Sequence, residues 1–359
     1  MTAQKIEEAL EYAESLNNGR EKVSVLDDAV RQADVLGDEA LQYQTRMELI
    51  DALYYVNGAD QTLAHFAWVL SHYDAHREDF DWASAAELMW KYKWVLNAVQ
   101  KFPQVPLSRV RELHADFAHR VREEDIGART VPYFGMQLAE HLGDHSAARA
   151  QFSLWQYTGR DVLSDCEACE AHSLVEYHVF QRQDEQAIRA AALILAGRET
   201  CAHVPHITHA ALLAPLMRLD RWDEAAEQHR VGAPLVRGDE SLISAQAEHL
   251  AYLGAARRFG EAAGWYDRHV ADALATHEHD RVLDFHAGAA VYLLVLAASG
   301  VSDLPVRSPG PAVTTPAVLA EWHKSQARAL VAHFDARNGT DWQTRRLEGV
   351  LALADLTPV

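Results

Sequence analysis

One feature limits the fold of this chain more than any other: a polar turn followed by a small alanine recurs at nearly constant spacing. The alanines are Ala148, Ala187, Ala225 and Ala262, which lie 39, 38 and 37 residues apart. This spacing is typical of helix-turn-helix repeats, and a looser spacing of about 40 to 44 residues continues the pattern toward the N-terminus. The sequence therefore predicts stacked pairs of antiparallel helices.

The rest of the chain also has the periodicity of α-helices. Apolar residues recur at i, i+3, i+4 and i+7, and no stretch alternates in the way that predicts a strand. Near the N-terminus the pattern predicts helices over residues 6–16 and 23–36, separated by Asn17-Asn18-Gly19. We therefore expect an all-α fold.

The repeat pattern ends near residue 300. The segment 301–316 contains four prolines, so it is predicted to be a loop. Two more helices are expected after it. Since the open end of a repeat stack exposes an apolar face, they are expected to act as a cap. The predicted organisation is a repeat region over 1–300, a Pro-rich loop over 301–316 and capping helices over 317–359.

The charge balance is strongly acidic, with a formal net charge of −19 from 52 acidic and 33 basic residues. Such a balance disfavours nucleic acid as a partner, because that affinity rests on Lys and Arg. The negative charge could attract basic peptides or proteins. Alternatively, it only keeps the protein soluble. The N-terminus lacks the features of a signal peptide, and the most apolar run, 287–299, is too short to span a bilayer. We expect a cytoplasmic protein without a membrane partner.

All three cysteines lie where two successive repeats begin. Asp165 is a suitable N-cap for a helix that continues to about residue 182. Cys166 and Cys169 would then lie in its first turn, three residues apart and on one face.

The third cysteine precedes the first helix of the next repeat. Pro205 suits the first turn of that helix, which places Cys201 and His203 in the loop before it and His206 at its start. Neighbouring helices in such a stack lie about 8–10 Å apart. These side chains should therefore meet the first two cysteines at one edge.

Three cysteines and one histidine form a complete tetrahedral zinc set. The expected ligands are Cys166, Cys169, Cys201 and His206, with His203 as the alternate fourth ligand. Four protein ligands close a site, so the zinc would be a structural clip between two repeats. Two other interpretations stay open: thiols that pack as small apolar groups, and a redox role for the Cys-x-x-Cys pair.

Sequence motifs of catalysis are absent. The chain has no Gly-rich phosphate loop, no His-Glu-x-x-His and no Gly-x-Ser-x-Gly. His277 and His279 flank Glu278, and we interpret them as a solvated helix end. The sequence predicts no enzymatic activity.

The stretch Arg-Trp-Asp-Glu-Ala-Ala at 221–226 resembles the turn between helices A and B of the tetratricopeptide-repeat family, and Leu212, Leu213 and Leu216 fit the apolar face of helix A. The resemblance covers roughly residues 3–300, although the repeats exceed the family's usual length of about 34 residues and lack its regular proline. It implies a right-handed superhelical solenoid. Asp-Cys-x-x-Cys, Cys-x-x-Val-Pro-His and the Trp-Lys-Tyr-Lys-Trp run at 90–94 are similar to motifs of a group of bacterial tetratricopeptide-like proteins.

The resemblance also implies which residues line a concave groove, because the family places them at fixed distances before the small alanine. In the middle of the chain this rule selects mainly polar and aromatic side chains, namely Trp90, Lys93, Asn97, Gln100, Thr130, Tyr133, Gln137, Glu140, Cys169, His172, Glu176 and Val179. Toward the C-terminus it selects Ile207, Ala210, Ala214 and Met217.

These observations predict a non-enzymatic scaffold or adaptor that binds a peptide or protein segment in its groove. The first alternative is a regulator that senses a small peptide or ligand. The second is a metal- or thiol-dependent enzyme.

Overall fold

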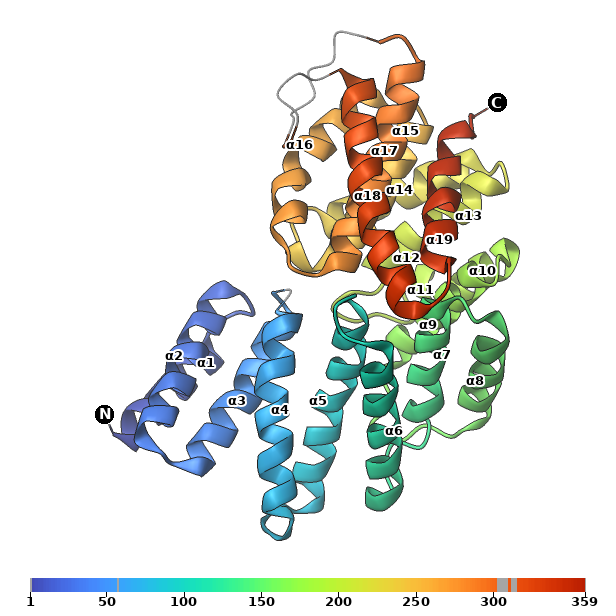
Figure 1. The fold of residues 1–359 in the computed structure, drawn as a ribbon. Coiled ribbons are helices and arrows are strands. Elements are labelled where there is room, and N and C mark those ends of the chain that lie inside the picture. The colour runs from blue at the N-terminus through green and yellow to red at the C-terminus, as the bar shows by residue number, and fades with distance from the viewer. Residues whose placement is uncertain (1, 57, 302–308, 311–314, 359) are drawn as a thin grey trace. The chain divides into compact units, whose positions relative to one another are not determined.

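A computed structural model describes residues 2–56, 58–301, 309–310 and 315–358. Within these ranges the chain consists of helices, turns and loops and contains no strand, which confirms the expected all-α class (Figure 1). The helices form two compact units. Unit 1 comprises Met1–Gln137 and Arg149–Ser164, and unit 2 comprises Leu138–Ala148 and Asp165–Val359.

Unit 1 is built from helices that pack against their neighbours in sequence, and α1 with α3 and α3 with α5 also make contact. The predicted break at residues 17–19 is present. The helices are α1 (Ala3–Ser15), α2 (Arg20–Leu36), α3 (Glu39–Tyr54), α4 (Ala59–Ala75), α5 (Trp82–Gln100) and α6 (Leu107–Glu124), with a 3-10 turn η1 (Arg77–Asp79). The helices α7 (Thr130–Leu142) and α8 (His145–Tyr157) each belong partly to unit 1 and partly to unit 2.

Helix ends in unit 1 follow from local chemistry. Gly37 ends α2 in a left-handed conformation with φ 75°, which glycine adopts without a steric cost. The carboxylate of Asp38 then accepts a hydrogen bond from the Leu41 amide at 3.1 Å and caps α3. Asp81 caps α5 in the same way through the Ser84 amide at 2.8 Å.

Unit 2 contains the remaining helices, and several of them are short. They are α9 (Glu167–Phe180), α10 (Asp184–Ala190), α11 (Ala192–Leu195), α12 (His206–Ala211), α13 (Leu213–Arg218), α14 (Trp222–Val236), α15 (Ile243–Ala255), α16 (Phe259–Ala275), α17 (His279–Ala298), α18 (Pro316–Asn338) and α19 (Trp342–Leu351), with 3-10 turns η2 (Glu240–Leu242) and η3 (Ala352–Asp355).

The turn-and-alanine pattern corresponds to a repeated local structure. The alanine is the fourth residue of α8, α10, α14 and α16, and each of the four is 0% exposed: Ala148, Ala187, Ala225 and Ala262. A side chain of minimal size at this point lets the paired helices approach closely. The fold is therefore helical and repeat-like where the sequence predicted repeats.

The same four turns share a backbone conformation. The residue two positions before each helix has a positive φ between 57° and 72°: Gly143, Arg182, Asp220 and Arg257. The following amide closes the turn on a carbonyl five residues earlier, as in Arg258 N to Leu253 O at 2.9 Å. Three non-glycine residues thus adopt a conformation that is uncommon for side chains with a Cβ.

The centre of unit 2 is the close crossing of α15 and α17. A Cβ added to Gly254 would lie 2.4 Å from the Tyr292 Cα, and one added to Gly288 would lie 2.3 Å from the Ala247 carbonyl oxygen. Glycine is therefore required at both contacts. Helix α17 has the length and hydropathy of a membrane span, but 67% of its most apolar window is buried, as in the core helix of a soluble protein.

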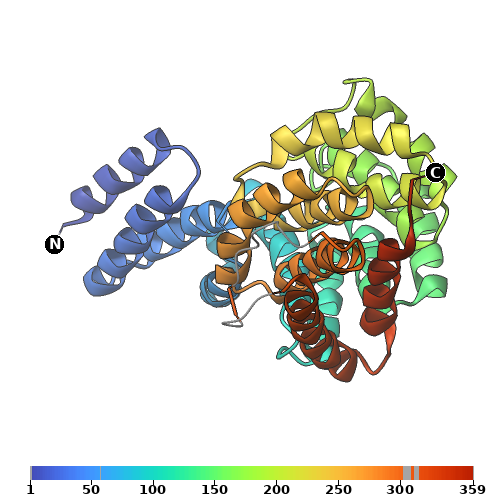
Figure 2. The ribbon, with the colours of Figure 1, turned by 90° about the horizontal axis from the view of Figure 1, so that it is seen from above.

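The two helices predicted at the C-terminus are present, and they are separated by Gly339 with φ 68°. Helix α18 lies along α17 in both views (Figure 1, Figure 2). It begins at Pro316, a residue assigned to the loop from the sequence, because Thr315 caps the helix and proline suits its first turn. Residues 302–308 and 311–314 of the predicted loop lie outside the described residues.

Candidate functional site

The three cysteines of unit 2 come together as the sequence predicted. The sulfur atoms of Cys166, Cys169 and Cys201 all lie within 4.8 Å of one another. The Sγ atoms of Cys169 and Cys201 are 3.4 Å apart. Cys166 is exposed and the other two are half-buried, so the cluster lies at the surface of the unit.

The helix that carries the Cys-x-x-Cys pair begins differently from the prediction. Cys166, and not Asp165, is the N-cap of α9, because its Sγ accepts a hydrogen bond from the Cys169 amide at 3.4 Å. The positive end of the helix dipole favours a thiolate at this position. Burial, followed by the nearby thiols of Cys166 and Cys201, raises the pKa of the Cys169 thiol.

Buried apolar side chains pack against the cysteine cluster. Ala168, Ile194 and Val204 are buried together, and Cys169 and Cys201 pack against them. The Cys201 amide donates to the Val204 carbonyl at 2.9 Å, which holds the loop before α12 in a turn. The positions of the sulfur atoms are thus set by packing and by backbone hydrogen bonds.

The structure does not bring a histidine into this cluster. His206 is the first residue of α12, as expected, and His203 lies in the preceding loop. Neither joins the three sulfurs within 4.8 Å. The buried Nδ1 atom of His206 has no hydrogen-bond partner in the described part of the chain.

The arrangement of the sulfurs suits a soft or borderline metal ion. Zinc–sulfur bonds of about 2.3 Å in a tetrahedron place two thiolates about 3.8 Å apart. The separation of 3.4 Å between Cys169 and Cys201 is near that value. The three cysteines could therefore supply three of the four ligands.

Part of the groove predicted from the sequence is packed inside unit 1. Lys93 is 2% exposed, and its amine donates to the Leu163 carbonyl at 2.7 Å and lies 3.5 Å from the ring centre of Trp90. Trp90 is half-buried, while Asn97 is exposed. Lys93 thus holds the core together instead of facing a groove.

The next predicted set has a similar role. Thr130 is buried and donates to the same Leu163 carbonyl at 3.2 Å. Tyr133 is buried against Trp155, with ring centres 5.2 Å apart. Gln137 is half-buried, and its Oε1 atom lacks a hydrogen-bond partner among the described residues.

The last predicted pair lies in unit 2. His172 is buried and its Nδ1 is 3.0 Å from the Thr208 hydroxyl. Its Nε2 lies 3.4 Å from the Glu176 carboxylate, and the Glu176 side chain is 55% exposed. Enclosure by protein opposes ionisation of Glu176, but the nearby His172 outweighs it and lowers the pKa of the carboxyl.

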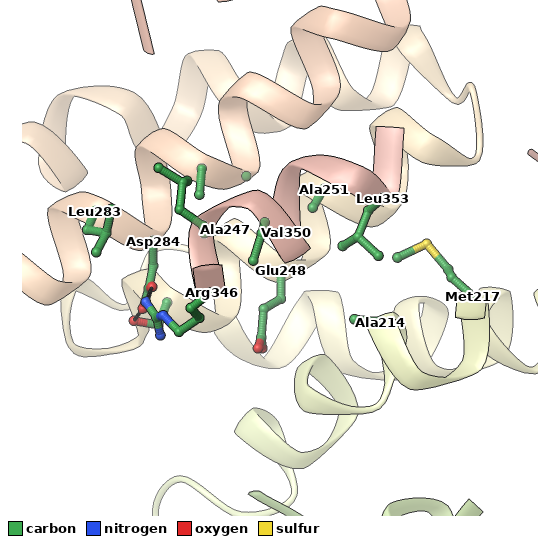
Figure 3. A pocket seen from close by; sticks show the side chains of 14 residues that line it. Ala214, Met217, Ala247, Glu248, Ala251, Leu283, Asp284, Arg346, Val350 and Leu353 are labelled. Atoms are coloured by element: carbon green, nitrogen blue, oxygen red, sulfur yellow. Dashed lines mark hydrogen bonds and ion pairs between the residues drawn. The ribbon is translucent and has the colours of Figure 1, made fainter. Parts of the chain in front are cut away.

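Unit 2 contains an open pocket of about 140 Å³ (Figure 3). Small and apolar side chains make up most of its wall, and they come from α13, α15, α17, α19 and η3. Two of them, Ala214 and Met217, are positions that the sequence rule assigned to the groove. The other apolar lining residues are Ala247, Ala251, Leu283, Ala287, Gly288, Leu347, Val350 and Leu353.

The polar groups of the pocket are two carboxylates, one arginine and one serine: Glu248, Asp284, Arg346 and Ser244. Asp284 pairs with Arg346 and accepts a hydrogen bond from the Ser244 hydroxyl at 2.7 Å. In the described part of the chain, no hydrogen bond or ion pair to Glu248 is present. Its side chain is exposed because it faces the open pocket, but the surrounding protein, then Asp284 and Glu176, raise the pKa of Glu248 to about 8.

A further carboxylate lies near Glu176. Glu140, in the part of α7 that belongs to unit 2, has a buried Oε1 atom without a hydrogen-bond partner among the described residues. Burial, with a smaller contribution from Glu176, raises the pKa of Glu140 to about 8. Glu140, Glu176 and Glu248 therefore form a group of neighbouring carboxylates with an excess of negative charge when ionised.

Sequence reasoning selected Glu140 through the groove rule but missed Glu248, Asp284 and Arg346. Asp284 and Arg346 are 62 residues apart and come from helices α17 and α19. Helical periodicity shows which residues share a face, but it does not show which faces meet. The only available signal was the groove rule, which pointed to Ala214 and Met217.

Neither a protein-family model nor a curated protein matches the chain. The similarity to the tetratricopeptide-repeat family therefore rests on the sequence pattern.

Proposed function

We propose that this protein is a non-enzymatic, cytoplasmic helical-repeat scaffold that binds a peptide or protein segment through a basic side chain. In this proposal the repeats follow the right-handed superhelical arrangement of tetratricopeptide-like proteins, and the pocket of unit 2 is the part of the concave surface that selects the ligand. The single observation that carries it is Glu248, a carboxylate without a partner among the described residues, in a pocket whose wall is mostly apolar and whose other carboxylate, Asp284, is paired with Arg346.

Charge and shape both favour such a ligand. A carboxylate enclosed by protein is costly to ionise without a partner, so an incoming ammonium or guanidinium group gains a strong charge-assisted hydrogen bond. The apolar wall formed by residues such as Met217 and Leu353 suits the methylene stem of lysine or arginine. The net charge of −19 adds long-range attraction for basic segments.

Selection from a displayed library of random twelve-residue peptides tests this function. We expect the selected peptides to contain a lysine or arginine flanked by apolar residues. Binding of a selected peptide should weaken about 10- to 150-fold in Glu248→Gln, since hydrogen bonds to charged groups contribute about 1.5–3 kcal/mol in proteins.

Glu227→Gln is the matched control. Glu227 is an exposed carboxylate of the same unit that pairs with Arg230 at 2.6 Å, so its loss should leave peptide affinity unchanged. Selection of peptides without basic residues, or equal affinity of the wild type and Glu248→Gln, would contradict the proposal.

We also propose that Cys166, Cys169 and Cys201 hold a structural zinc ion that joins the start of α9 to the loop before α12. His206 supplies the fourth ligand after a side-chain rotation, with His203 as the alternate. Support comes from the grouping of the three sulfurs and from the buried, unpartnered Nδ1 of His206.

Elemental analysis of the purified protein tests the zinc clip. The wild type should contain bound zinc, and Cys166→Ser should contain less, because a lost thiolate weakens the site. Chelation should lower the melting temperature of the wild type by clearly more than that of Cys166→Ser. A wild type without zinc, whose melting temperature does not respond to a chelator, would show that the thiols are packing residues.

A further inference from the structure

A second group of metal-ligating side chains lies in unit 1, far in sequence from the cysteines. Glu39, His72 and His76 place one ligand atom each within 4.8 Å of one another. Glu39 is the first residue of α3, His72 lies in the last turn of α4 and His76 is the C-cap of α4. Residues four apart on a helix share a face, so both imidazoles point to the same side.

The distances between the ligand atoms are close to those of a coordination shell. Oε2 of Glu39 lies 3.8 Å from Nδ1 of His72 and 3.7 Å from Nε2 of His76. Zinc bonds of about 2.0–2.1 Å to nitrogen and oxygen place tetrahedral ligand atoms about 3.4 Å apart. A movement of a few tenths of an ångström by the Glu39 carboxylate, whose side chain is 63% exposed, would close this gap.

A hydrogen bond orients His76 for metal binding. Its Nδ1 is 3.0 Å from the His72 carbonyl oxygen, which can only accept, so Nδ1 carries a hydrogen. In the neutral imidazole the lone pair is then on Nε2, the atom that faces Glu39. Metal-bound histidines in proteins are usually held by this kind of bond from the other ring nitrogen.

Aromatic packing fixes the second imidazole. The His72 ring is stacked on Trp68 at 5.2 Å with an interplanar angle of 6°, and it also contacts Tyr43 and Phe80. Its side chain is 13% exposed. His76 is 41% exposed and Glu39 is 63% exposed, so solvent and ions can reach the group.

We infer that Glu39, His72 and His76 form a binding site for a divalent transition-metal ion, with zinc as the ion to test. Imidazole nitrogen favours zinc and its transition-metal neighbours over magnesium or calcium. Three protein ligands leave one coordination position open to water or to a ligand from outside the chain. The site is independent of the pocket and of the cysteines of unit 2.

Equilibrium dialysis and calorimetric titration of the full chain with zinc ions alone test this inference. A variant with all three cysteines changed to serine removes the other zinc-binding group and should still bind one zinc per chain. In that background His76→Gln should weaken the remaining affinity by at least about tenfold, since it removes a direct ligand. Glu39→Gln should weaken it by a smaller factor.

His119→Gln is the matched control, because His119 forms an exposed His–Glu pair with Glu123 at 3.2 Å but lacks a third ligand. It should bind zinc as the parent does. The inference is overturned if the cysteine-free chain binds no zinc, or if His76→Gln and His119→Gln bind it equally. Either result would leave the two histidines as partners of Glu39 in ordinary ion pairs.

Discussion

Unit 1 and unit 2 differ in the partners of their ionisable side chains. In unit 1, cations from one helix pair with carboxylates of another: Arg46 of α3 pairs with Asp34 of α2 at 2.9 Å, and Arg120 of α6 pairs with Asp74 of α4 at 2.6 Å. Arg120 also pairs with Asp116 of its own helix at 2.8 Å. In unit 2, the interior holds neutral histidines and the carboxylates of the pocket.

The histidines of unit 2 form two buried pairs. The Nδ1 atoms of His229 and His249 are 3.0 Å apart, and those of His286 and His323 are 2.7 Å apart. One member of each pair must donate and the other must accept, so at least one ring of each pair is neutral. The comparison teaches that both units pair charged side chains, but unit 2 also contains buried pairs of histidines and, in Glu248, a carboxylate without a partner among the described residues.

The largest expected loss of folding stability comes from a substitution that disrupts the packing of unit 2 alone. Gly254→Ala would place a methyl group 2.4 Å from the Tyr292 Cα, and overpacking of this kind costs about 1–3 kcal/mol. Gly264→Ala in α16 is the control, because no atom lies within 4 Å of its added Cβ. It should stabilise the protein by up to about 1 kcal/mol.

Urea denaturation followed by pulsed hydrogen exchange measures both glycine variants, since it reports the stability of each unit separately. The loss in Gly254→Ala should appear in unit 2 and leave unit 1 unchanged. Equal stability of the two variants would show that α15 and α17 do not cross as closely as described.

The second effect is a dependence of unit 2 on pH. Burial lowers the pKa of His229 and of His286 from 6.5 to about 4. Below pH 6.5 the unfolded chain therefore binds more protons than the folded one, and stability falls as pH falls toward 4. Near pH 5 the loss should be about 1–2 kcal/mol for each such histidine.

Glu140 and Glu248 change the folding stability with pH in the direction opposite to that of the histidines. Because their pKa values are raised to about 8, the stability that they contribute at low pH is lost as pH rises from 4.5 toward 8. A variant with both changed to Gln should lose stability more steeply than the wild type between pH 8 and about pH 5. Parallel pH profiles of the two proteins in urea denaturation would argue against raised pKa values for Glu140 and Glu248.

The smallest effect concerns the ion pairs of unit 1. Arg120→Met should cost about 1 kcal/mol, the upper range for partly exposed pairs, because two aspartates lose their partner. Arg109→Met, which removes an exposed pair with Glu112, should change stability by less than about 0.5 kcal/mol. The difference should shrink in high salt, as measured by urea denaturation.

Much of the helical organisation could be predicted, because it depends on local signals. Small alanines, polar turns and Gly37 act within a few residues of their own position. The burial of Lys93 could not be predicted, since a lysine three residues from a tryptophan equally suits an exposed groove. It is buried because the Leu163 carbonyl, 70 residues away, accepts its amine.

In the candidate sites, too, some features could be predicted from local sequence signals and others could not. The three cysteines were found because they start successive repeats. The pocket carboxylates and the histidine pairs were not found from the sequence, because their partners come from helices whose contact depends on the tertiary fold. The Glu39–His72–His76 group combines both cases: the i, i+4 histidines are visible in the sequence, whereas the glutamate comes from the preceding helix.

The division of α7 and α8 between the two units affects how the units can be separated in the gene. Unit 2 takes Leu138–Ala148 from the middle of the chain, and unit 1 takes the following Arg149–Ser164. No single cut of the gene yields both units whole. A recombination event or an expressed fragment that ends at either boundary leaves one unit without one of its own segments, so the two units are expected to be gained, lost and transferred together.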